Sequence, residues 1–467
     1  MVGTLAGGVL VGHGHRQAAD AFDEATHRDC MFGTSGIRGA VGETVTAALA
    51  LAVGRAVGVD AERVVVGRDP RESGRLLVDA LTAGLREQGT AVVDLGMAAS
   101  PTVARAVGWE DAQAGVSVTA SHNPPPDNGM KLWQASGQAF TPAQQRQIAD
   151  RVTEDSWQLR SASSLGTRRR TDGQRRHLDR LVESVDSDIG LPVVVDVGNG
   201  AGGITVEALR ELGCAVRTLN GTPDGRFPGR PSEPTAANCG ALRRLVASSD
   251  ALLGVAHDGD ADRMMAVTED GEFLSGDVLL AILAEAAVTP GDTVAVPVDT
   301  SLAVEDFLDE KGVTVERTPV GDVHIAHAVA AGARFGGEPS GAWIWQDETY
   351  CPDGPLAALK LAVLATERPL ADRAAAIPTY PIRRSTVETT AKTELMGALE
   401  RAVTEEYETV SGADGVRVST ADGWFLVRAS GTESLVRVTA EAREAERSDR
   451  LAATALDLVE NTRTAVE

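Results

Sequence analysis

The sequence predicts an α/β protein with three tandem α/β domains, whose sheets are mixed but rich in parallel strands, and a smaller C-terminal α+β domain. Two observations carry this prediction. Three segments repeat one order of apolar strand, turn, amphipathic helix and second strand, which is typical of right-handed crossover units in parallel sheets. Beyond Pro378 the pattern changes to short strands flanked by helices. A chain of 467 residues is long enough for three or four domains.

The three repeats begin with strands made of valine, alanine and other small residues. We expect these strands at residues 64–67, 193–196 and 293–296, the helices near 73–87, 204–212 and 303–310, and the second strands at 90–95, 215–219 and 313–318. In the last domain we expect strands at 415–419, 424–428 and 435–440 and helices at 392–407 and 448–461. The change from alternating elements to an antiparallel pattern indicates a different domain type.

Polar composition and motif positions predict the domain boundaries. A stretch rich in serine and arginine, residues 155–173, is expected to separate the first two domains, and the next boundary is placed near Gly276. The domains are then residues 31–155, 156–275, 276–377 and 378–467. Residues 1–30 are Gly-rich and lack the basic flank of a signal peptide, so we expect an upstream extension without ordered structure, with Met31 as an alternative start.

The charge balance is strongly acidic. The chain carries 67 acidic residues against 44 Lys plus Arg, a formal charge of -23, and only four of the bases are lysine. A negative field repels nucleic acid and anionic lipid, while a local basic pocket can still bind a small phosphorylated ligand. We therefore expect a small-molecule partner and neither nucleic acid nor membrane. The acid surplus indicates a salt-rich, halophilic cytosol, and a GC-rich genome is the alternative explanation for the scarcity of lysine.

Cysteine usage and hydropathy point to the cytoplasm. Cys30, Cys214, Cys239 and Cys351 are far apart and form no CxxC pair, which is typical of free thiols in a reducing compartment. No run approaches the 18 or so apolar residues of a membrane span. We expect a cytoplasmic protein.

The most informative stretch is TASHNPPPDNGMK, residues 119–131. It places Ser121 and His122 on a polar turn directly after an expected strand at 115–118, and it ends at Lys131. Three consecutive prolines cannot join a helix or a sheet interior, so Ser121 must lie in a stiff, irregular loop. Such loops often carry function, although serine, asparagine and proline also satisfy ordinary turns.

A second motif, DGDADR, follows an apolar strand expected at residues 251–256. Its carboxylates, Asp258, Asp260 and Asp262, alternate, and on an extended or looping backbone such side chains point to one side, where they can converge on a divalent cation. An EF-hand is excluded because Arg263 stands where that loop needs glycine. With no histidine or cysteine among the three ligands, Mg²⁺ is favoured over zinc, and a solvated acidic turn is the alternative. Arg263 would suit a phosphoryl oxygen.

Two further clusters are weak when taken singly. Arg428, Ser430, Gly431 and Thr432 offer the cation, hydroxyls and close backbone approach that a phosphate dianion needs, but Ser-Gly-Thr is also a common hairpin turn. The segment FGTSGIRG, which contains Arg38, is another cluster of glycine, hydroxyl and arginine.

Glu338 and Ser340 place a carboxylate and a hydroxyl two residues apart. Together they can accept from and donate to neighbouring hydroxyls of a sugar. A tight turn with an incidental glutamate is the alternative interpretation.

In their order and spacing, the Arg38 segment, the Ser121 loop, the aspartate triad, the Glu338 pair and the Arg428 loop resemble the α-D-phosphohexomutase superfamily. This superfamily includes phosphoglucomutases, phosphomannomutases and phosphoglucosamine mutases. The resemblance spans about residues 31–467, and the Ser121 and triad motifs are its most specific parts. It implies four domains around a central cleft, each contributing one motif.

The resemblance also implies roles for the motif residues. Ser121 would be carried as a phosphoserine, and the three aspartates would hold Mg²⁺ together with a phosphoryl oxygen on Ser121. Arg38 and Lys131 match positions linked to proton transfer or charge stabilisation. Lys131 could serve as the general acid or base if its pKa were lowered, and His122, its rival, is expected to position the serine.

The substrate contacts follow in the same way. Glu338 and Ser340 would contact sugar hydroxyls. The residues expected to bind the phosphate that is not reacting are Arg428, Ser430, Gly431 and Thr432.

The implied reaction interconverts hexose 6-phosphate and hexose 1-phosphate through phospho-Ser121 and a hexose 1,6-bisphosphate, which serves as intermediate and activator. Glucosamine phosphate is the favoured substrate, and a phosphomannomutase, phosphoglucomutase or dual-specificity enzyme is the alternative. A sugar phosphatase or a non-catalytic sugar-phosphate sensor would be a different class. We expect a monomer or a homodimer.

The chain departs from the family pattern in three places. Ala429 and Ser434 replace prolines in the phosphate loop. Ala342 follows Gly341 where the family more often has histidine, which removes a candidate proton shuttle. Pro339, between Glu338 and Ser340, is most like archaeal phosphoglucosamine mutase-like sequences.

Overall fold

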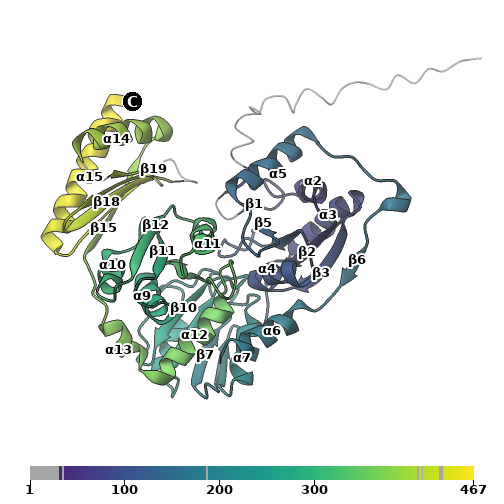
Figure 1. Ribbon diagram of the computed structural model, residues 1–467, viewed down its shortest axis with the longest axis horizontal. Coiled ribbons are helices and arrows are strands. Elements are labelled where there is room, and N and C mark those ends of the chain that lie inside the picture. The colour runs from purple at the N-terminus through teal and green to yellow at the C-terminus, as the bar shows by residue number, and fades with distance from the viewer. Residues whose placement is uncertain are drawn as a thin grey trace, which may run out of the picture.

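The computed structural model describes residues 31–33, 36–185, 188–407, 410–412, 414–430 and 435–466 of the chain. Figure 1 shows three α/β units, one after another, and a C-terminal unit at the upper left. The predicted fold class is therefore confirmed. The predicted extension at residues 1–30 and the phosphate-loop residues Gly431 and Thr432 lie outside the described residues.

The first three units share one sheet plan. In each sheet, three neighbouring strands run parallel. The last of these three in the chain is followed by a strand that pairs with it in the antiparallel direction. The strand orders that correspond are β5-β4-β2-β3, β10-β9-β7-β8 and β14-β13-β11-β12. The loop before each antiparallel strand thus occupies the same place in every unit. These loops carry Ser121, the aspartate triad and the Glu338 pair.

The first sheet has two additional strands at its edges. In spatial order its strands are β1 (Ile37–Ala40), β5 (Asp127–Gln134), β4 (Ala114–Val118), β2 (Arg63–Arg68), β3 (Ala91–Met97) and β6 (Arg168–Arg170). The helices of this unit are α2 (Ala47–Gly58), α3 (Gly74–Glu87), α4 (Ser100–Trp109) and α5 (Pro142–Glu154), followed by the short 3-10 turn η1 (Ala162–Ser164).

Strand β6 lies in the polar stretch that the sequence places between the first two domains. It pairs in parallel with β3, from Arg168 opposite Val92 to Arg170 opposite Asp94. All three arginines of β6 are exposed, so the strand has no apolar residue by which a hydrophobic pattern could reveal it.

The second and third units follow the common plan. The strands of the second unit are β7 (Pro192–Asp196), β8 (Ala215–Leu219), β9 (Leu253–His257) and β10 (Met264–Thr268), with helices α6 (Gly173–Glu183), α7 (Gly203–Glu211) and α8 (Gly240–Ala247). The third unit has β11 (Thr293–Pro297), β12 (Thr314–Thr318), β13 (Phe335–Glu338) and β14 (Ala342–Trp345), with α9 (Gly276–Ala287), α10 (Leu302–Asp309), α11 (Asp322–Ala331), α12 (Gly354–Glu367) and α13 (Leu370–Ala375).

The C-terminal unit is an antiparallel sheet packed against two helices. Its strands, in spatial order, are β15 (Ile382–Glu388), β19 (Leu435–Ala442), β18 (Gly423–Ala429), β17 (Val416–Thr420) and β16 (Val410–Ser411), and its helices are α14 (Lys392–Glu406) and α15 (Ala445–Val466). The predicted helices at 392–407 and 448–461 correspond to α14 and α15.

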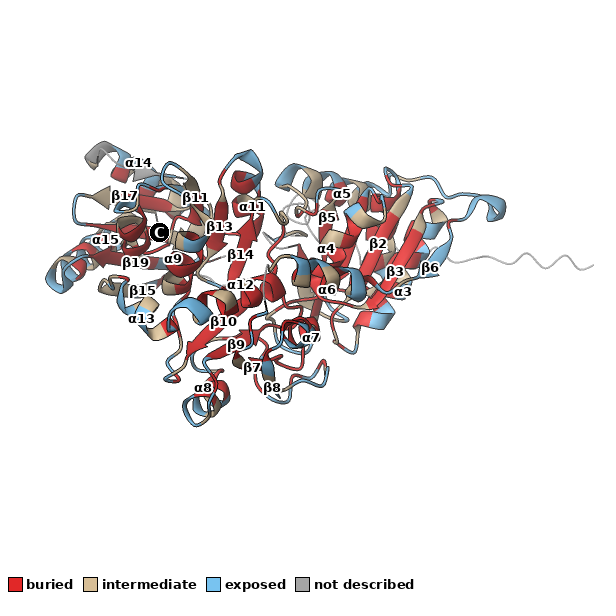
Figure 2. Cartoon of the chain, turned by 60° about the horizontal axis from the view of Figure 1, so that its bottom comes forward, coloured by how far each residue is buried: buried red, intermediate tan, exposed pale blue. Residues whose placement is uncertain are grey.

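Burial explains why the central strands are recognisable in the sequence. The valine runs at 64–66 and 193–195 are fully buried, because helices cover both faces of each parallel sheet (Figure 2). The largest hydrophobic core is a single cluster of buried side chains from the second and third units, with Leu178 as its first residue and Ile377 as its last. The C-terminal unit has its own core and meets the third unit at a small cluster of Val298, Trp424 and Leu426. None of the described helices is long and apolar enough to cross a membrane.

Candidate active site

Ser121 lies in the loop that joins β4 to β5. Its backbone φ is +49°, a left-handed conformation that is uncommon for residues other than glycine. The Ser121 N–H donates to Thr119 Oγ1 at 2.8 Å. The hydroxyl donates to Asp258 Oδ2 at 2.6 Å, so the structure brings the first two motifs into direct contact.

A buried arginine, Arg71, fastens this loop. Its guanidinium donates to four backbone carbonyls of the loop: Ser121 at 2.9 Å, Asn123 at 2.7 Å, Pro124 at 2.6 Å and Asp127 at 2.8 Å. Arg71 Nε is paired with Asp69 Oδ2 at 2.9 Å. These contacts hold the loop in its strained conformation.

Sequence reasoning did not find Arg71 or Asp69. Both follow β2 in a polar segment, GRDPRESG, that resembles an ordinary strand-to-helix turn. The only signal in the sequence was an arginine two residues after an aspartate. The neighbouring residues do not indicate that Arg71 contacts a loop about 50 residues further along the chain.

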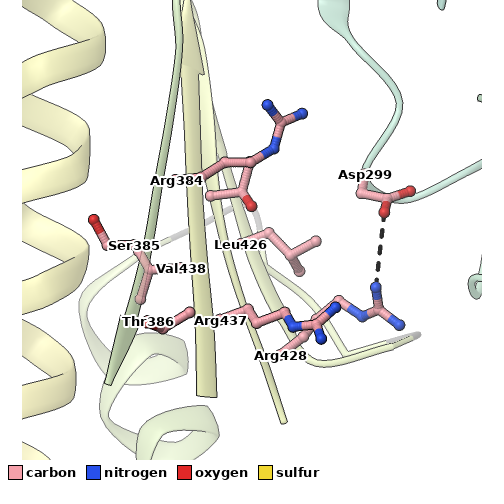
Figure 3. Close-up of a pocket in the computed structure, with 9 residues that line it drawn as sticks. Asp299, Arg384, Ser385, Thr386, Leu426, Arg428, Arg437 and Val438 are labelled. Atoms are coloured by element: carbon pink, nitrogen blue, oxygen red, sulfur yellow. Dashed lines mark ion pairs between the residues drawn. The ribbon is translucent and has the colours of Figure 1, made fainter. Parts of the chain in front are cut away.

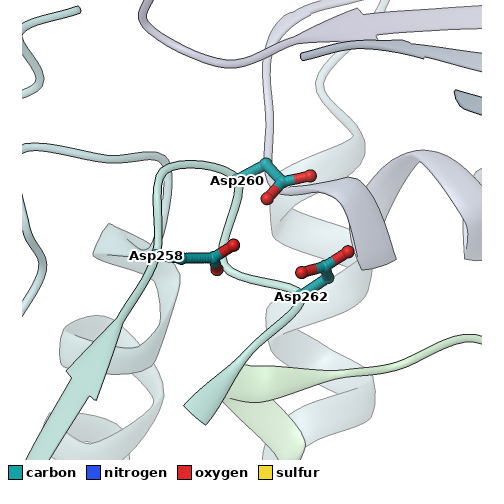
Figure 4. A group of neighbouring side chains, drawn as sticks. All are labelled: Asp258, Asp260 and Asp262. Atoms are coloured by element: carbon teal, nitrogen blue, oxygen red, sulfur yellow. The ribbon is translucent and has the colours of Figure 1, made fainter. Parts of the chain in front are cut away.

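The aspartate triad forms the loop between β9 and β10. Oxygen atoms of Asp258, Asp260 and Asp262 lie within 4.8 Å of one another, and all three residues are buried (Figure 4). Asp260 Oδ2 accepts a hydrogen bond from Ser100 Oγ at 2.5 Å, while Asp260 Oδ1 is buried without a partner in the described protein. A buried carboxylate oxygen without a partner is costly unless a cation compensates it.

The charges of the triad fit a divalent metal. Burial and the charge of Asp262 raise the pKa of Asp258, and burial with both neighbouring aspartates raises the pKa of Asp260 well above its usual range. This repulsion would be relieved by a hard cation, and three carboxylate oxygens without histidine or cysteine suit Mg²⁺. The residues present therefore fit the predicted metal.

Lys131, on β5, connects the first three units. Its Nζ donates to Asp262 Oδ2 at 3.3 Å and to Asp322 Oδ2 at 2.5 Å. Burial opposes the charged amine, but the carboxylates of Asp322 and Asp262 outweigh it and raise the pKa of Lys131. The lowered pKa that a basic role for Lys131 would need is thus not found.

His122, in contrast to Lys131, is uncharged. Its Nδ1 lies 3.2 Å from Ser121 Oγ. Burial, together with the charges of Arg263 and Arg38, lowers the pKa of His122 to about 3, so the imidazole is neutral at physiological pH. Arg38 lies on β1, opposite Gly129 of β5, and thereby brings its charge to this group.

Glu338 is the last residue of β13, and Ser340 lies in the loop that follows it. Ser340 Oγ donates to Glu338 Oε2 at 3.2 Å, and Glu338 Oε1 accepts from the Gly321 N–H at 2.6 Å. Burial and the nearby charge of Asp322 raise the pKa of Glu338 to about 7. This loop is joined to the triad loop by a hydrogen bond from the Met264 N–H to the Gly341 carbonyl at 2.9 Å.

Arg428 lies near the end of β18 and faces the third unit. It is paired with Asp414 at 2.9 Å and with Asp299 at 3.7 Å. A pocket of about 370 Å³ next to it is also lined by Arg384 and Arg437, which come from neighbouring strands of the same sheet (Figure 3). Ser430, at the end of the strand, is buried. The structure thus adds two arginines that the local motif did not predict.

Three consecutive residues before and at the start of α11 connect these groups. The Val320 N–H donates to Asp414, the ion-pair partner of Arg428. The Gly321 N–H donates to Glu338, and Asp322 is paired with Lys131. The turn at residues 320–322 therefore links the C-terminal unit, Glu338 and Lys131. It carries none of the predicted motifs.

Comparison with known proteins gives consistent matches along the chain. Models of the phosphoglucomutase/phosphomannomutase family match in order: alpha/beta/alpha domain I at residues 29–159, domain II at 175–271, domain III at 275–380 and the C-terminal domain at 384–458.

Relatives align over nearly the whole length. A protein of Methanopyrus kandleri named "probable phosphoglucosamine mutase" is 45% identical over 92% of this chain and 97% of its own, and one of Methanosarcina acetivorans with the same name is 46% identical over 89% and 95%. The crystal structure of a phosphoglucomutase/phosphomannomutase family protein from Burkholderia thailandensis has a TM-score of 0.84 at 27% identity, covering 94% of this chain and 99% of that one.

Proposed function

Because the chain belongs to the phosphoglucomutase/phosphomannomutase family and is a phosphohexomutase, we propose that it interconverts glucosamine 6-phosphate and glucosamine 1-phosphate through a phosphorylated Ser121 and a hexose 1,6-bisphosphate. The contact between Ser121 Oγ and Asp258 carries this proposal, because it places the candidate phosphoryl carrier on the candidate metal ligands. A bound Mg²⁺ would neutralise charge on the transferring phosphoryl group, held by the triad and one phosphoryl oxygen on Ser121.

The transfer breaks the bond between phosphorus and Ser121 Oγ and forms a bond between phosphorus and the free hydroxyl oxygen of the sugar phosphate. The sugar hydroxyl loses one proton and Ser121 Oγ takes one up, so that the serine hydroxyl is restored. The bisphosphate then turns, and its other phosphoryl group returns to Ser121. The pocket beside Arg428 would hold whichever phosphate is not reacting, since a guanidinium cluster binds a phosphate dianion without regard to the carbon that bears it.

Proton transfer at the hydroxyl needs a group that is free to accept. Lys131 would first have to lose its own proton, which Asp262 and Asp322 oppose, so its charge is better suited to stabilising the transferring phosphoryl group. His122 is neutral, but the burial and positive charges that lower its pKa to about 3 also make it a weak base. Ser121 Oγ gives its hydrogen to Asp258, so the His122 Nδ1 beside it is suited to donate to that oxygen, and we propose His122 as a residue that positions the serine.

Glucosamine fits the charges around the sugar motif. Glu338 is influenced by the negative charges of Asp322 and Asp299 as well as by burial. The amino group of glucosamine would add a cation among these carboxylates and relieve their repulsion, whereas glucose and mannose would not. The names of the archaeal relatives point to the same sugar.

We also propose that the enzyme works in a salt-rich cytoplasm as a monomer or a homodimer. The charge of -23 supports the first part. The described cysteines, Cys214, Cys239 and Cys351, are buried free thiols, as expected for a reducing compartment.

A ³¹P NMR assay tests the reaction. The enzyme is incubated with the 6-phosphates of glucosamine, mannose and glucose in turn, with Mg²⁺ and a trace of the matching bisphosphate, and we expect fastest conversion of glucosamine phosphate. Free phosphate as the only product would show a phosphatase, and binding without turnover would show a sensor.

The Ser121→Ala variant tests the phosphoryl carrier. We expect it to lose activity by about a thousandfold or more, because the variant lacks the oxygen that contacts Asp258 and is proposed to carry the phosphoryl group. Ser136→Ala, an exposed serine of the same unit, is the control and should keep full activity. Removal of divalent metal with EDTA should abolish turnover of the wild type, and activity that survives it would contradict the metal assignment.

A further inference from the structure

A second basic pocket lies on the first unit. It has a volume of about 320 Å³, and four arginines line it: Arg68, Arg75, Arg168 and Arg170. They come from the end of β2, the start of α3 and strand β6. None of the predicted catalytic or substrate-binding residues is among its lining residues.

The two acidic residues in this pocket do not neutralise it. Asp79 and Asp94 are both paired with Arg168, at 2.9 Å and 2.8 Å. The other oxygen of Asp94 accepts from the Gly96 N–H at 2.8 Å. Arg75 and Arg170 form no ion pair with any residue that the structure describes. In a chain with a charge of -23, an uncompensated cluster of arginines is a specific local reversal of sign.

The guanidinium groups are close enough to repel one another. Burial and the charges of Arg75 and Arg170 lower the pKa of Arg68, and its Nη1 is held by the Asp69 carbonyl at 2.8 Å. The guanidinium of Arg170 packs against the backbone of Gly96. A Cβ added to Gly96 would lie 2.7 Å from Arg170 Nη2. Gly96 therefore allows the arginine to reach over the sheet into the pocket.

The surrounding backbone adds to the positive potential. Arg75 is the second residue of α3, a helix of 14 residues whose N-cap, Ser73, makes no capping hydrogen bond with its side chain. The positive end of the helix dipole thus faces the side of the pocket formed by Arg75. An anion bound there would receive charge-assisted hydrogen bonds from several directions.

A neighbouring cavity leaves room for more than a phosphate. It has a volume of about 560 Å³ and shares Arg68 and Arg75 with the first pocket. Its other lining residues are Pro70, Arg71, Glu72 and Met97 of the first unit and Pro223 of the second. We propose that the two cavities form a binding site for a small phosphate monoester, with the phosphate between Arg75 and Arg170 and the organic part towards Met97 and Pro223. Inorganic phosphate has the same chemistry as the phosphate group of this monoester.

Titration calorimetry with inorganic phosphate, at constant ionic strength, tests the site. An Arg428→Gln background weakens phosphate binding at the active site. In this background we expect Arg75→Gln with Arg170→Gln to weaken the remaining phosphate binding by about tenfold or more, because two charge-assisted contacts are lost. Both side chains are exposed and Arg68 is left intact, so the fold should be kept, as thermal unfolding would show.

Arg146→Gln is the matched control, because Arg146 is an exposed arginine on α5 of the same unit. It should change phosphate affinity less than twofold. An equal loss in this control, or no loss in the double variant, would overturn the proposal.

Two further measurements identify the ligand. If glucose 6-phosphate binds the Arg428→Gln protein more tightly than inorganic phosphate, and the double variant removes that difference, the second cavity holds the organic part. If both bind equally, the site is one for phosphate alone, and the proposed monoester is wrong. Crystals soaked in tungstate should show an anomalous peak between Arg75 and Arg170, and its absence at saturating tungstate would contradict the site.

Discussion

Ser121 combines a left-handed backbone with a hydroxyl that touches the triad, and Arg71 binds the backbone of the loop that carries it. Removal of the arginine would take one hydrogen bond from each of the four loop carbonyls and leave Asp69 as a buried charge without its counterion. The Ser121 and Pro124 carbonyls would keep their second donors, Ser232 Oγ and the Asp127 N–H. Such a residue can control catalysis without touching the substrate, because a phosphoryl carrier must be held within a fraction of an ångström of its acceptor.

We expect Arg71→Met to lower kcat by about tenfold to a hundredfold through misplacement of Ser121 and to lower the free energy of unfolding by about 3–5 kcal/mol. Steady-state kinetics and urea denaturation measure the two effects. Arg105→Met is the control, because Arg105 is paired with Asp353 at 2.8 Å and does not contact the Ser121 loop. It should also lose stability but keep kcat within about twofold. Equal losses of kcat in both variants would contradict a specific role for Arg71.

The charge of Glu338 predicts a dependence of stability on pH. Its pKa is raised by burial and by Asp322 from 4.5 in the unfolded chain to about 7 in the folded protein. The proton is therefore bound more tightly in the folded state. The resulting contribution to stability is fully present below pH 4.5 and is lost as the pH rises through about 7.

Glu338→Gln removes this titration and retains an oxygen that can accept from Gly321. We expect the free energy of unfolding of the variant, minus that of the wild type, to increase as the pH rises from 5 to 8. Urea denaturation measures both values. Parallel pH profiles for the two proteins would show that Glu338 ionises normally in the folded state.

The three motif loops are equivalent elements of a repeated sheet. Each joins the third parallel strand to the antiparallel strand, and parallel strands deliver their carboxyl ends to one edge of the sheet, where α/β proteins bind their ligands. The start of α9 supports the loop of the third unit. An added Cβ at Gly276, the first residue of α9, would overlap the backbone of Pro339.

We expect Gly276→Ala to displace the loop with Glu338 and Ser340 and to raise KM for the sugar phosphate by about tenfold. Gly203→Ala is a matched control, since Gly203 is the first residue of α7 and an added Cβ meets no atom within 4 Å. Its KM should match that of the wild type. Kinetics that show no difference between the two variants would mean that the loop moves without affecting the sugar.

The whole molecule carries its negative charge over several units, and this charge opposes compaction. Screening lengths fall from about 10 Å at 0.1 M salt to about 3 Å at 1 M, so high salt weakens repulsion between exposed acids. We expect Tm, measured by differential scanning fluorimetry, to rise by about 5 °C or more between 0.1 and 2 M KCl, as the charge of -23 is screened.

Sucrose serves as the control for this effect, because it strengthens burial without screening charge. It should raise Tm less than KCl does. An equal rise in both solutes, or a Tm that is flat in KCl, would contradict the screening explanation.

Much of the fold and part of the site could be predicted because their signals are local. Valine runs mark strands buried on both faces, and alternate aspartates in DGDADR mark a cluster of ligands, since neighbours in the chain must be neighbours in space. Strand β6 was not predicted because its arginines are exposed. Arg71 and Asp322 were not predicted because their partners are 50 and 191 residues away.

The sequence by itself determined the fold class and the family resemblance, and it supplied the hydroxyl and carboxylates that we propose as carriers of the chemistry. Only the tertiary structure decided their electrostatic state: that Lys131 keeps its proton between Asp262 and Asp322, that His122 is neutral, and that Glu338 ionises near pH 7. The physical reason is that burial and charge interactions depend on distances in space. The turn at residues 320–322 sets several of those distances at once by joining three units.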